Sequence, residues 1–288
     1  MIGQIILNSL ALGSIYALTA LGFVVIFRAS DVVNFAQGEM MMLGAMVALL
    51  LYRNAHLGYV ESFALAIVIC MAAGAFVERI AFRPLMNAPH FTILLSTVAI
   101  GQIIRSAVRI LFGQEVSSFP GVLSATPLSF LGLRTTAQNL GIVAVAFATL
   151  LAFVLVFSRT RIGWAMKAAA QNKRGAAIVG INVSRTNAQV WAMAGGLAAI
   201  AGILLAPLII ITPDMGVIGN KGFIAAILGG FTSLPGAVLG GFILALAENL
   251  IGVYISSAFK DAIVFVLLIL VLVARPSGLL GRRVVKRV

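Results

Sequence analysis

Charged residues are scarce in this chain of 288 residues. Asp and Glu together number 8 and Lys and Arg number 20, so 10% of the residues are charged, against roughly 25% in a soluble domain. Hydrophobic residues make up 61%, and the mean hydropathy is +1.12. This composition excludes a water-soluble globular protein and predicts a chain that crosses a membrane several times.

Residue types that build catalytic and metal sites are also few. The single cysteine, Cys70, excludes an intrachain disulfide and lies in an apolar stretch typical of a packed core thiol. The two histidines, His56 and His90, lie near the ends of apolar runs. The sequence contains neither the phosphate-binding GxxxxGK motif nor the HExxH zinc motif. We therefore expect no enzyme activity, no metal and no bound cofactor. A solute would move passively, with an ion gradient, or with ATP hydrolysed by separate subunits.

Several apolar runs are long enough to cross a hydrocarbon core, which takes about 20 residues. The uncharged ones are 5–27, 135–158, 186–213 and 222–247. Helices are expected, because lipid cannot satisfy open backbone groups and the runs lack the alternation of barrel strands. The first run has no basic flank or cleavage site of a signal peptide, so we expect it to be retained.

The distribution of basic residues predicts the orientation. Segment 158–185 and the tail 275–288 carry Lys and Arg but no acidic residue, which places both in the cytoplasm. The N-terminus then lies outside, and 113–139 is the longest extracytoplasmic loop. The net charge of +12 is therefore explained by the basic segments on the cytoplasmic side, and it does not indicate a nucleic-acid partner.

Counting outward from these two cytoplasmic segments predicts the number of membrane crossings. Four are expected after segment 158–185, at about 188–211, 217–233, 235–257 and 260–275, the second being short and re-entrant or discontinuous. Five before it give nine crossings, with eight as the alternative. The expected fold is an all-α, polytopic helical bundle of the bacterial inner membrane, built as one domain over 1–288.

Two segments of the chain resemble each other. "GFVVIFRASDVVNFAQGEMMMLGA" (22–45) and "LIIITPDMGVIGNKGFIAAILGG" (208–230) each run from an apolar span through a polar break into a Gly-rich span. Transporters are often built from such repeats, with sites on broken helices. This similarity suggests an internal pseudo-repeat. The GxxxG at 236–240 indicates close helix packing and no chemical role.

Polar side chains at the beginning of two spans are the candidates for the translocation pathway. They are Asn34, Gln37 and Glu39 before and in the second span, and Asn220 and Lys221 in the seventh. Each costs free energy to take out of water, so we expect them to face the bundle interior, with Gly38 permitting a break.

Further polar groups lie within predicted spans. For Glu248 and its neighbour Asn249, an anchor to an adjacent helix is favoured over contact with solute. Arg105 and Arg109 share a helix face. They are expected to pair with Glu39 or Glu248 or to reach the membrane interface, the latter being favoured for Arg109.

Segment 162–180 has a pattern beyond its charge. Ile162, Met166, Ala169 and Ala170 recur at helical spacing, and 175–177 offers small residues. This pattern predicts a short cytoplasmic helix that docks into a groove of a partner. The alternative is a solvated basic loop, which explains the charge but not the apolar face.

Five motifs carry a resemblance to a known family over nearly the whole chain. They are "VVNFAQGEMMMLGA", "ERIAFRPL", "RTRIGWAMKAAAQNKRGAAIVGINV", "GFIAAILGGFTSLPGAVLGG" and "KDAIVFVLLILVLVARPSGLLG". They resemble the permease subunits of ABC importers for branched-chain amino acids, the LivH type.

The resemblance implies a type II-like permease that works in an assembly. Its partners would be a second related permease (as a heterodimer, or a homodimer), two cytoplasmic ATPase subunits and a periplasmic binding protein that delivers Leu, Ile or Val. Segment 158–187 would then be the coupling segment against the ATPase. Its candidate contact residues are Arg159, Arg161, Gly163, Lys167, Gly175 and Ala176. ATP would be used by the partner subunits only.

Two alternatives remain at this level. A related permease could carry urea or another small polar solute. A self-sufficient secondary transporter would belong to a different class, and such proteins usually place several ionisable residues at mid-membrane, whereas this chain has few.

Overall fold

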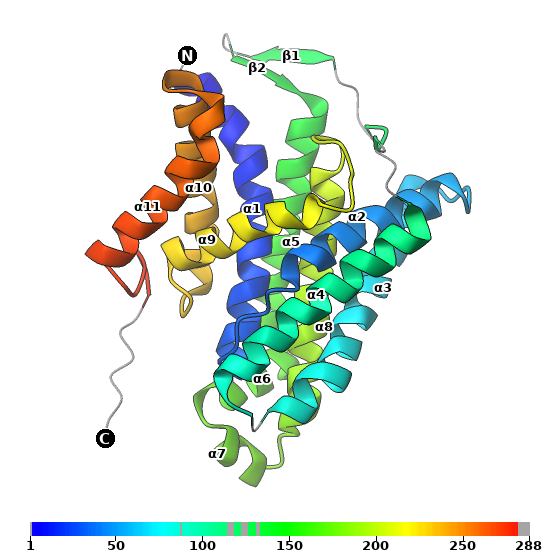
Figure 1. Cartoon of the computed structure of the whole chain (residues 1–288), viewed down its shortest axis with the longest axis vertical. Coiled ribbons are helices and arrows are strands. Elements are labelled where there is room, and N and C mark those ends of the chain that lie inside the picture. The colour runs from blue at the N-terminus through cyan, green and yellow to red at the C-terminus, as the bar shows by residue number, and fades with distance from the viewer. Residues whose placement is uncertain (1, 87, 114–117, 122–125, 131–132, 282–288) are drawn as a thin grey trace.

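The protein is a helical bundle (Figure 1). The computed structural model describes residues 2–86, 88–113, 118–121, 126–130 and 133–281. Seven helical segments in this part are long and apolar enough to cross a membrane: α1 (Ile2–Ser30), α3 with η1 and η2 (Tyr59–Leu85), α4 (His90–Phe112), α5 (Ala137–Arg159), α8 (Val183–Leu205), α10 (Leu234–Tyr254) and η4 with α11 (Ser257–Ala274). The predicted all-α, polytopic class is confirmed.

Helix α1 lies at the centre of the bundle. It is buried over most of its length and packs against α8, α10 and the short helix α9 (Gly219–Gly229). Helix α8 is also largely buried, against α2 (Gln37–Arg53) and α3. By contrast, α4, α5 and α11 lie at the periphery and expose most of their apolar surface. Side chains exposed on such helices face lipid or other subunits in a membrane.

Two spans are broken, one in each half of the chain. Helix α1 ends at Ser30, Asp31 adopts a left-handed conformation with φ 59°, and an irregular stretch leads to α2 at Gln37. In the second half, α8 ends at Leu205, and residues 206–214 lead into η3 (Met215–Ile218) and α9. Both short helices begin inside the bundle (Figure 1). These two breaks are the segments that resemble each other in sequence.

The amino-terminal ends of α2 and α9 meet each other. A Cβ atom on Gly219 would collide with the backbone of Gly38, and one on Gly38 would collide with the carbonyl oxygen of Gly216. Gly38 therefore permits close approach of two helices. It does not make the break, as the sequence had suggested, because the break precedes it at 31–36.

The second half follows the predicted boundaries closely. The crossings expected at 217–233, 235–257 and 260–275 correspond to η3–α9, α10 and α11. Gly236 and Gly240 of α10 pack directly on the backbone of α9, at Gly229 and Ala225. The packing role expected of the GxxxG motif is therefore present.

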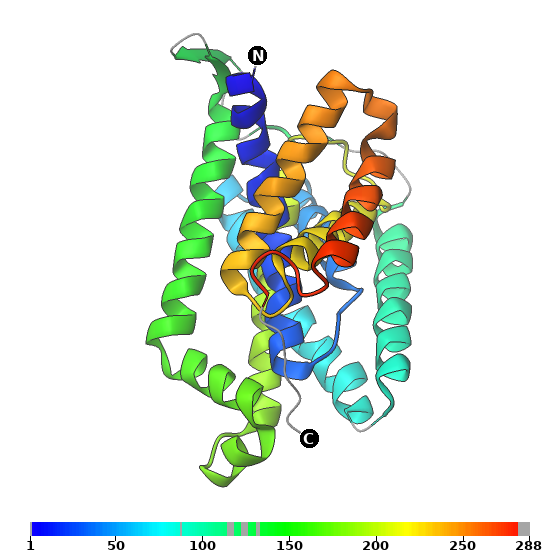
Figure 2. The ribbon, with the colours of Figure 1, turned by 90° about the vertical axis from the view of Figure 1, so that its left-hand side faces the viewer.

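Opposite ends of the bundle carry different structures (Figures 1 and 2). Beside the N-terminus lies an antiparallel hairpin of β1 (Pro127–Phe130) and β2 (Leu133–Thr136), in which Pro127 pairs with Thr136. The Arg134 backbone N–H donates to Gln4 Oε1 at 2.8 Å and so ties the hairpin to α1. The sequence had predicted only a loop over 113–139, of which 114–117, 122–125 and 131–132 lie outside the described residues.

The other end of the bundle carries α6 (Arg161–Gln171) and α7 (Lys173–Ile178), which together with the turn before α8 form the predicted coupling segment. Arg282, Arg283, Lys286 and Arg287 of the basic tail lie outside the described residues.

Candidate functional site

Glu39 begins the first of two charged clusters, each of which extends from a buried glutamate to an exposed aspartate. It is the third residue of α2, and its Oε1 accepts a hydrogen bond from Arg105 of α4. Arg105 also lies 3.9 Å from Asp214 Oδ1, to which Arg109 Nη2 donates at 2.6 Å. We call Glu39, Arg105, Arg109 and Asp214 the Glu39 cluster. Arg109, for which an interfacial position was favoured, is thus paired with Asp214 in the break that precedes η3.

The first break is held by amide groups. Asn34 Oδ1 accepts from the Ala36 N–H at 3.1 Å, and the Phe35 N–H donates to Thr97 Oγ1 of α4 at 3.2 Å. Gln37 Nε2 donates to the Ala194 carbonyl of α8 at 3.0 Å. The break is therefore fastened to two long helices, and Asn34 and Gln37 lie fully inside the bundle, as the sequence predicted.

Three buried polar atoms near this junction have no hydrogen-bond partner among the described residues: Asn34 Nδ2, Gln37 Oε1 and Glu39 Oε2. Buried polar groups are usually paired, since an unmade hydrogen bond costs about 1–3 kcal/mol. These atoms retain unused hydrogen-bonding capacity, and all three belong to residues that the sequence singled out.

Lys221 is the centre of the second cluster. It is the third residue of α9, and its ammonium group contacts Glu248 Oε1 of α10 at 2.5 Å and Asp261 Oδ1 of α11 at 2.9 Å. The Tyr16 hydroxyl of α1 donates to Glu248 Oε2 at 2.8 Å. We call these four residues the Lys221 cluster, which links four helices. Glu248 has the geometry of an anchor between helices.

Two other residues proposed from the sequence lie apart from the clusters. Asn249 Nδ2 donates to Ser9 Oγ of α1 at 2.9 Å, which adds a second contact between α10 and α1. Asn220 has an exposed side chain beside the buried junction. The structure therefore does not gather all five proposed pathway residues in one place.

The two clusters correspond in position but have opposite sign. In each half, the third residue of the short helix is charged and pairs with the second long helix that follows it, α4 or α11. Sequence reasoning missed Tyr16, Asp214 and Asp261. The signal for the two aspartates was their position: Asp214 lies in the polar break, and Asp261 lies at the start of the last apolar span.

The predicted coupling segment forms two helices, each with a side-chain cap. Thr160 Oγ1 accepts from the Gly163 N–H at 3.2 Å, and Asn172 Oδ1 accepts from the Gly175 N–H at 2.9 Å. Such caps satisfy amino-terminal N–H groups that a helix leaves open. Gly163 is required by close packing, because a Cβ atom there would collide with the Phe157 carbonyl.

Only half of the apolar face expected for docking is turned inward, because Ile162 and Ala170 are exposed. Met166 and Ala169 of α6 are buried within the chain, where α6 packs on α1, α5 and α8, and Ala176 is buried as well. The most exposed large apolar side chains of the segment are Trp164 of α6 and Ile178 and Val179 at the end of α7. The regular spacing in the sequence thus marked a face that is only partly packed, and exposed apolar surface lies on both α6 and α7.

Basic residues of this segment take different positions. Lys167 lies over the Phe157 ring at 4.9 Å, while Arg159 and Arg161 are exposed. Gly175 is half-buried beside its own cap. Lys173 Nζ lies 3.5 Å from Asp31 Oδ2, so α7 reaches the first break.

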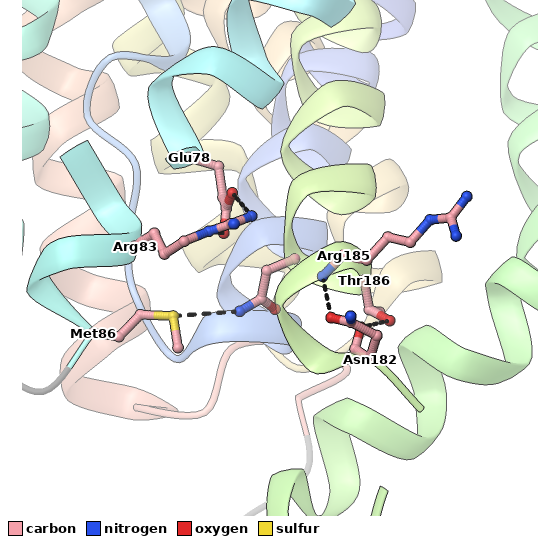
Figure 3. A network of polar contacts seen from close by, with 7 residues as sticks. Glu78, Arg83, Met86, Asn182, Arg185 and Thr186 are labelled. Atoms are coloured by element: carbon pink, nitrogen blue, oxygen red, sulfur yellow. Dashed lines mark hydrogen bonds and ion pairs between the residues drawn. The ribbon is translucent and has the colours of Figure 1, made fainter. Parts of the chain in front are cut away.

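Polar contacts also fasten the same end of the bundle (Figure 3). Fully buried Glu78 pairs with Arg83 at 2.9 Å, within the last helical turns before α4, which are η1 (Glu78–Phe82) and η2 (Arg83–Leu85). Asn182 caps α8, where its Oδ1 accepts from the Arg185 N–H at 2.9 Å. These contacts fix the position of these turns and of α8 next to the coupling segment.

The described residues contain no group of His, Cys, Asp and Glu that could hold a metal ion. Seven apolar spans, two short helices that meet end to end and charged clusters that reach into the bundle define a polytopic membrane protein of the transporter class.

Comparison with known proteins gives the family. Residues 5–272 match the family model described as branched-chain amino acid transport system / permease component. The chain belongs to this family of transport permeases. The family resemblance recognised in the sequence motifs is thereby confirmed, and the family is one of permeases rather than enzymes.

Relatives are similar over almost their full length. The high-affinity branched-chain amino acid transport system permease protein LivH of Escherichia coli is 35% identical, over 99% of this chain and 97% of that protein. BraD of Pseudomonas aeruginosa, a permease protein of the same description, is 32% identical over the same shares. A probable LivH of Methanocaldococcus jannaschii is 27% identical over 96% of this chain and 92% of that protein.

Replacing Lys221 with Met tests the Lys221 cluster. The Glu248 side chain, which is 7% exposed, would remain buried without its cation. Breaking one partner of a buried pair costs about 3–5 kcal/mol. We expect a loss of that order in the free energy of unfolding, measured as a lower unfolding temperature of the purified chain in detergent.

Two further variants control this experiment. Lys221→Met with Glu248→Gln neutralises both groups and should recover most of the loss. Lys260→Met removes a lysine that has no ion pair in the described part of the chain, and should change little. An equal loss in Lys221→Met and Lys260→Met would contradict the assignment.

Proposed function

We propose that this chain is the permease subunit of an ATP-driven importer that carries branched-chain amino acids (Leu, Ile or Val) across the bacterial inner membrane. The observation that carries the proposal is similarity over nearly the full length to permeases named for this transport. Further support comes from the helices broken inside the bundle, a feature of transporter sites.

ATP hydrolysis is assigned to two separate ATPase subunits. The chain has no phosphate-binding motif of its own, which supports this division. We place the ATPase contact at the end of α7, because Ile178 and Val179 are 85% and 74% exposed there. Apolar side chains exposed outside the apolar spans favour contact with another protein. A periplasmic binding protein delivers the substrate from the other side.

A second, related permease completes the pathway, as a heterodimer or a homodimer. Support comes from exposed polar side chains on α4 and α9, within or next to apolar segments: Gln102, Ser106 and Asn220. Polar groups are unfavourable toward lipid. We therefore assign this face to a partner permease and the pathway between the two.

The charges of the chain favour an N-terminus outside and α6 and α7 in the cytoplasm. Among residues 158–185, six are Lys or Arg and none is acidic, which is the distribution expected of a cytoplasmic segment.

Reconstitution tests the function. Liposomes that contain this permease, its partner permease, the two ATPases and the binding protein should accumulate leucine when ATP is supplied. Liposomes with this chain alone should do neither transport nor hydrolysis. Gradient-driven leucine uptake by the chain alone would support a secondary transporter instead, and uptake of urea but not leucine would show a different substrate.

The ATPase contact is tested with Ile178→Glu. A carboxylate at this exposed position disrupts an apolar contact without disturbing the fold, so the ATPase should co-purify about tenfold less, equivalent to roughly 1.4 kcal/mol. Val60→Glu is the matched control, because Val60 is 81% exposed at the start of α3. Equal co-purification of both variants with the ATPase would refute the placement.

Orientation is tested by labelling. In a Cys70→Ser background, which removes the one native thiol, Gly3→Cys and Arg174→Cys each provide a single target. A membrane-impermeant maleimide should label the first in intact spheroplasts and the second only after permeabilisation. The reverse pattern would invert the proposed topology.

A further inference from the structure

A cavity of about 270 Å³ lies where the first break, the beginning of α4, α7 and α8 come together. Its volume is close to the lower end of the range for small-molecule sites, roughly 300–1,000 Å³. A second cavity of about 480 Å³ adjoins it, shares Asp31, Val32 and His90, and reaches Val33 and Leu94. The cavity therefore continues along α4 beside the unwound stretch that leads to Glu39.

Two side chains that can donate hydrogen bonds line this cavity. Lys173 of α7 lines it, and the contacts of its ammonium group with Asp31 Oδ2 and the Ser30 carbonyl are both long, at 3.5 Å. An ammonium group has three donors, so Lys173 can also bind a ligand. His90 lines the cavity as the first residue of α4, a helix of 23 residues whose amino-terminal end favours negative charge. Lys173 and His90 suit a carboxylate.

Hydrogen-bond acceptors also line the cavity. Asn187 of α8 is 2% exposed, and its Oδ1 atom has no hydrogen-bond partner among the described residues. Its Nδ2 contacts only the Met86 sulfur, at 4.0 Å, and Met86 is seen next to the Glu78–Arg83 pair in Figure 3. The Asp31 carboxylate adds negative charge. Asn187 Oδ1 and Asp31 together suit an ammonium group.

The remaining wall of the cavity is apolar. Val32, Phe82 and Ile93 line it with side chains that are otherwise buried, and Met86 adds a flexible thioether. Such a wall favours an aliphatic group, because apolar surface is then removed from water. A simple anion such as phosphate would meet the Asp31 carboxylate beside Lys173 and would leave the apolar wall uncovered.

We propose that this cavity is a binding site for a zwitterionic amino acid with an aliphatic side chain. The substrate carboxylate binds Lys173 and His90, its ammonium group binds Asp31 and Asn187 Oδ1, and its side chain packs on Val32, Phe82 and Ile93. The inference rests on the proposed function and deepens it, since it gives the permease itself a substrate site on the side of α6 and α7.

The experiment uses the assembled transporter in nanodiscs without the binding protein. Tritiated L-leucine should bind to it, and binding should be competed by unlabelled leucine. The analogues 3-methylbutylamine and 4-methylpentanoate each lack one of the two charges and should compete at least about tenfold more weakly, the ratio expected for the loss of one charge-assisted hydrogen bond.

Asn187→Leu removes the acceptor at similar volume and should weaken leucine binding about tenfold. Asn139→Leu, at the start of α5 beside the hairpin, is the matched control and should bind like the wild type. Both variants are first required to elute as complete complexes. Asp31→Asn provides a second variant if Asn187→Leu does not assemble.

The outcomes separate the two levels of the proposal. A complex that fails to transport leucine with its binding protein would overturn the proposed function. A complex that transports leucine but binds it equally with and without the substitutions would overturn only the site. Equally tight competition by 4-methylpentanoate would identify an anion site and refute the zwitterion assignment.

Discussion

Charge pairing inside the bundle is the constraint on which the rest of the structure depends. An ionised side chain in the hydrocarbon region is costly unless it is paired. In this chain the charged third residues of α2 and α9 are paired with other helices, Glu39 with Arg105 and Lys221 with Glu248 and Asp261. The short helices must therefore lie where α4, α10 and α11 can reach them, which sets the positions of the peripheral helices around α1.

The charged residues at the beginnings of α2 and α9 have different numbers of partners. A helix N-terminus carries partial positive charge, which stabilises Glu39 and opposes Lys221. Glu39 has one arginine within hydrogen-bonding distance, whereas Lys221 contacts two carboxylates, and Tyr16 holds one of them from α1. The additional partners offset the unfavourable position of the lysine. The inverted charge thus explains why the second cluster has more members in hydrogen-bonding contact with its central residue.

The sequence correctly predicted the features that depend on the local pattern of residues. Long apolar runs gave the spans, and α9, α10 and α11 have nearly the predicted boundaries. Asn34 and Gln37 were expected inside the bundle because of their cost in lipid, and they are buried there.

Features that depend on contacts between distant segments were harder to predict from the sequence. The partners of Arg109 and Lys221 lie 105 and 27 residues or more away in sequence, so composition could not select them. The face of α6 was predicted from its spacing, but periodicity shows only that a face is apolar, and not whether it packs on its own chain. Met166 and Ala169 pack internally, whereas Trp164, Ile178 and Val179 are exposed.

The Glu39 cluster also connects the two breaks. Glu39 follows the first break at the start of α2, Asp214 ends the second, and Arg105 of α4 lies between these two carboxylates. At the other end of the first break, Asp31 lies beside Lys173 of α7 and lines the cavity. Glu39 and Arg105 belong to the same half of the bundle, so a movement of one half against the other leaves their pair intact. Asp214 belongs to the other half, and such a movement would separate it from Arg105 and Arg109. The pair between Glu39 and Arg105 therefore holds the first half together, and the contacts of Asp214 are the ones that such a movement must break.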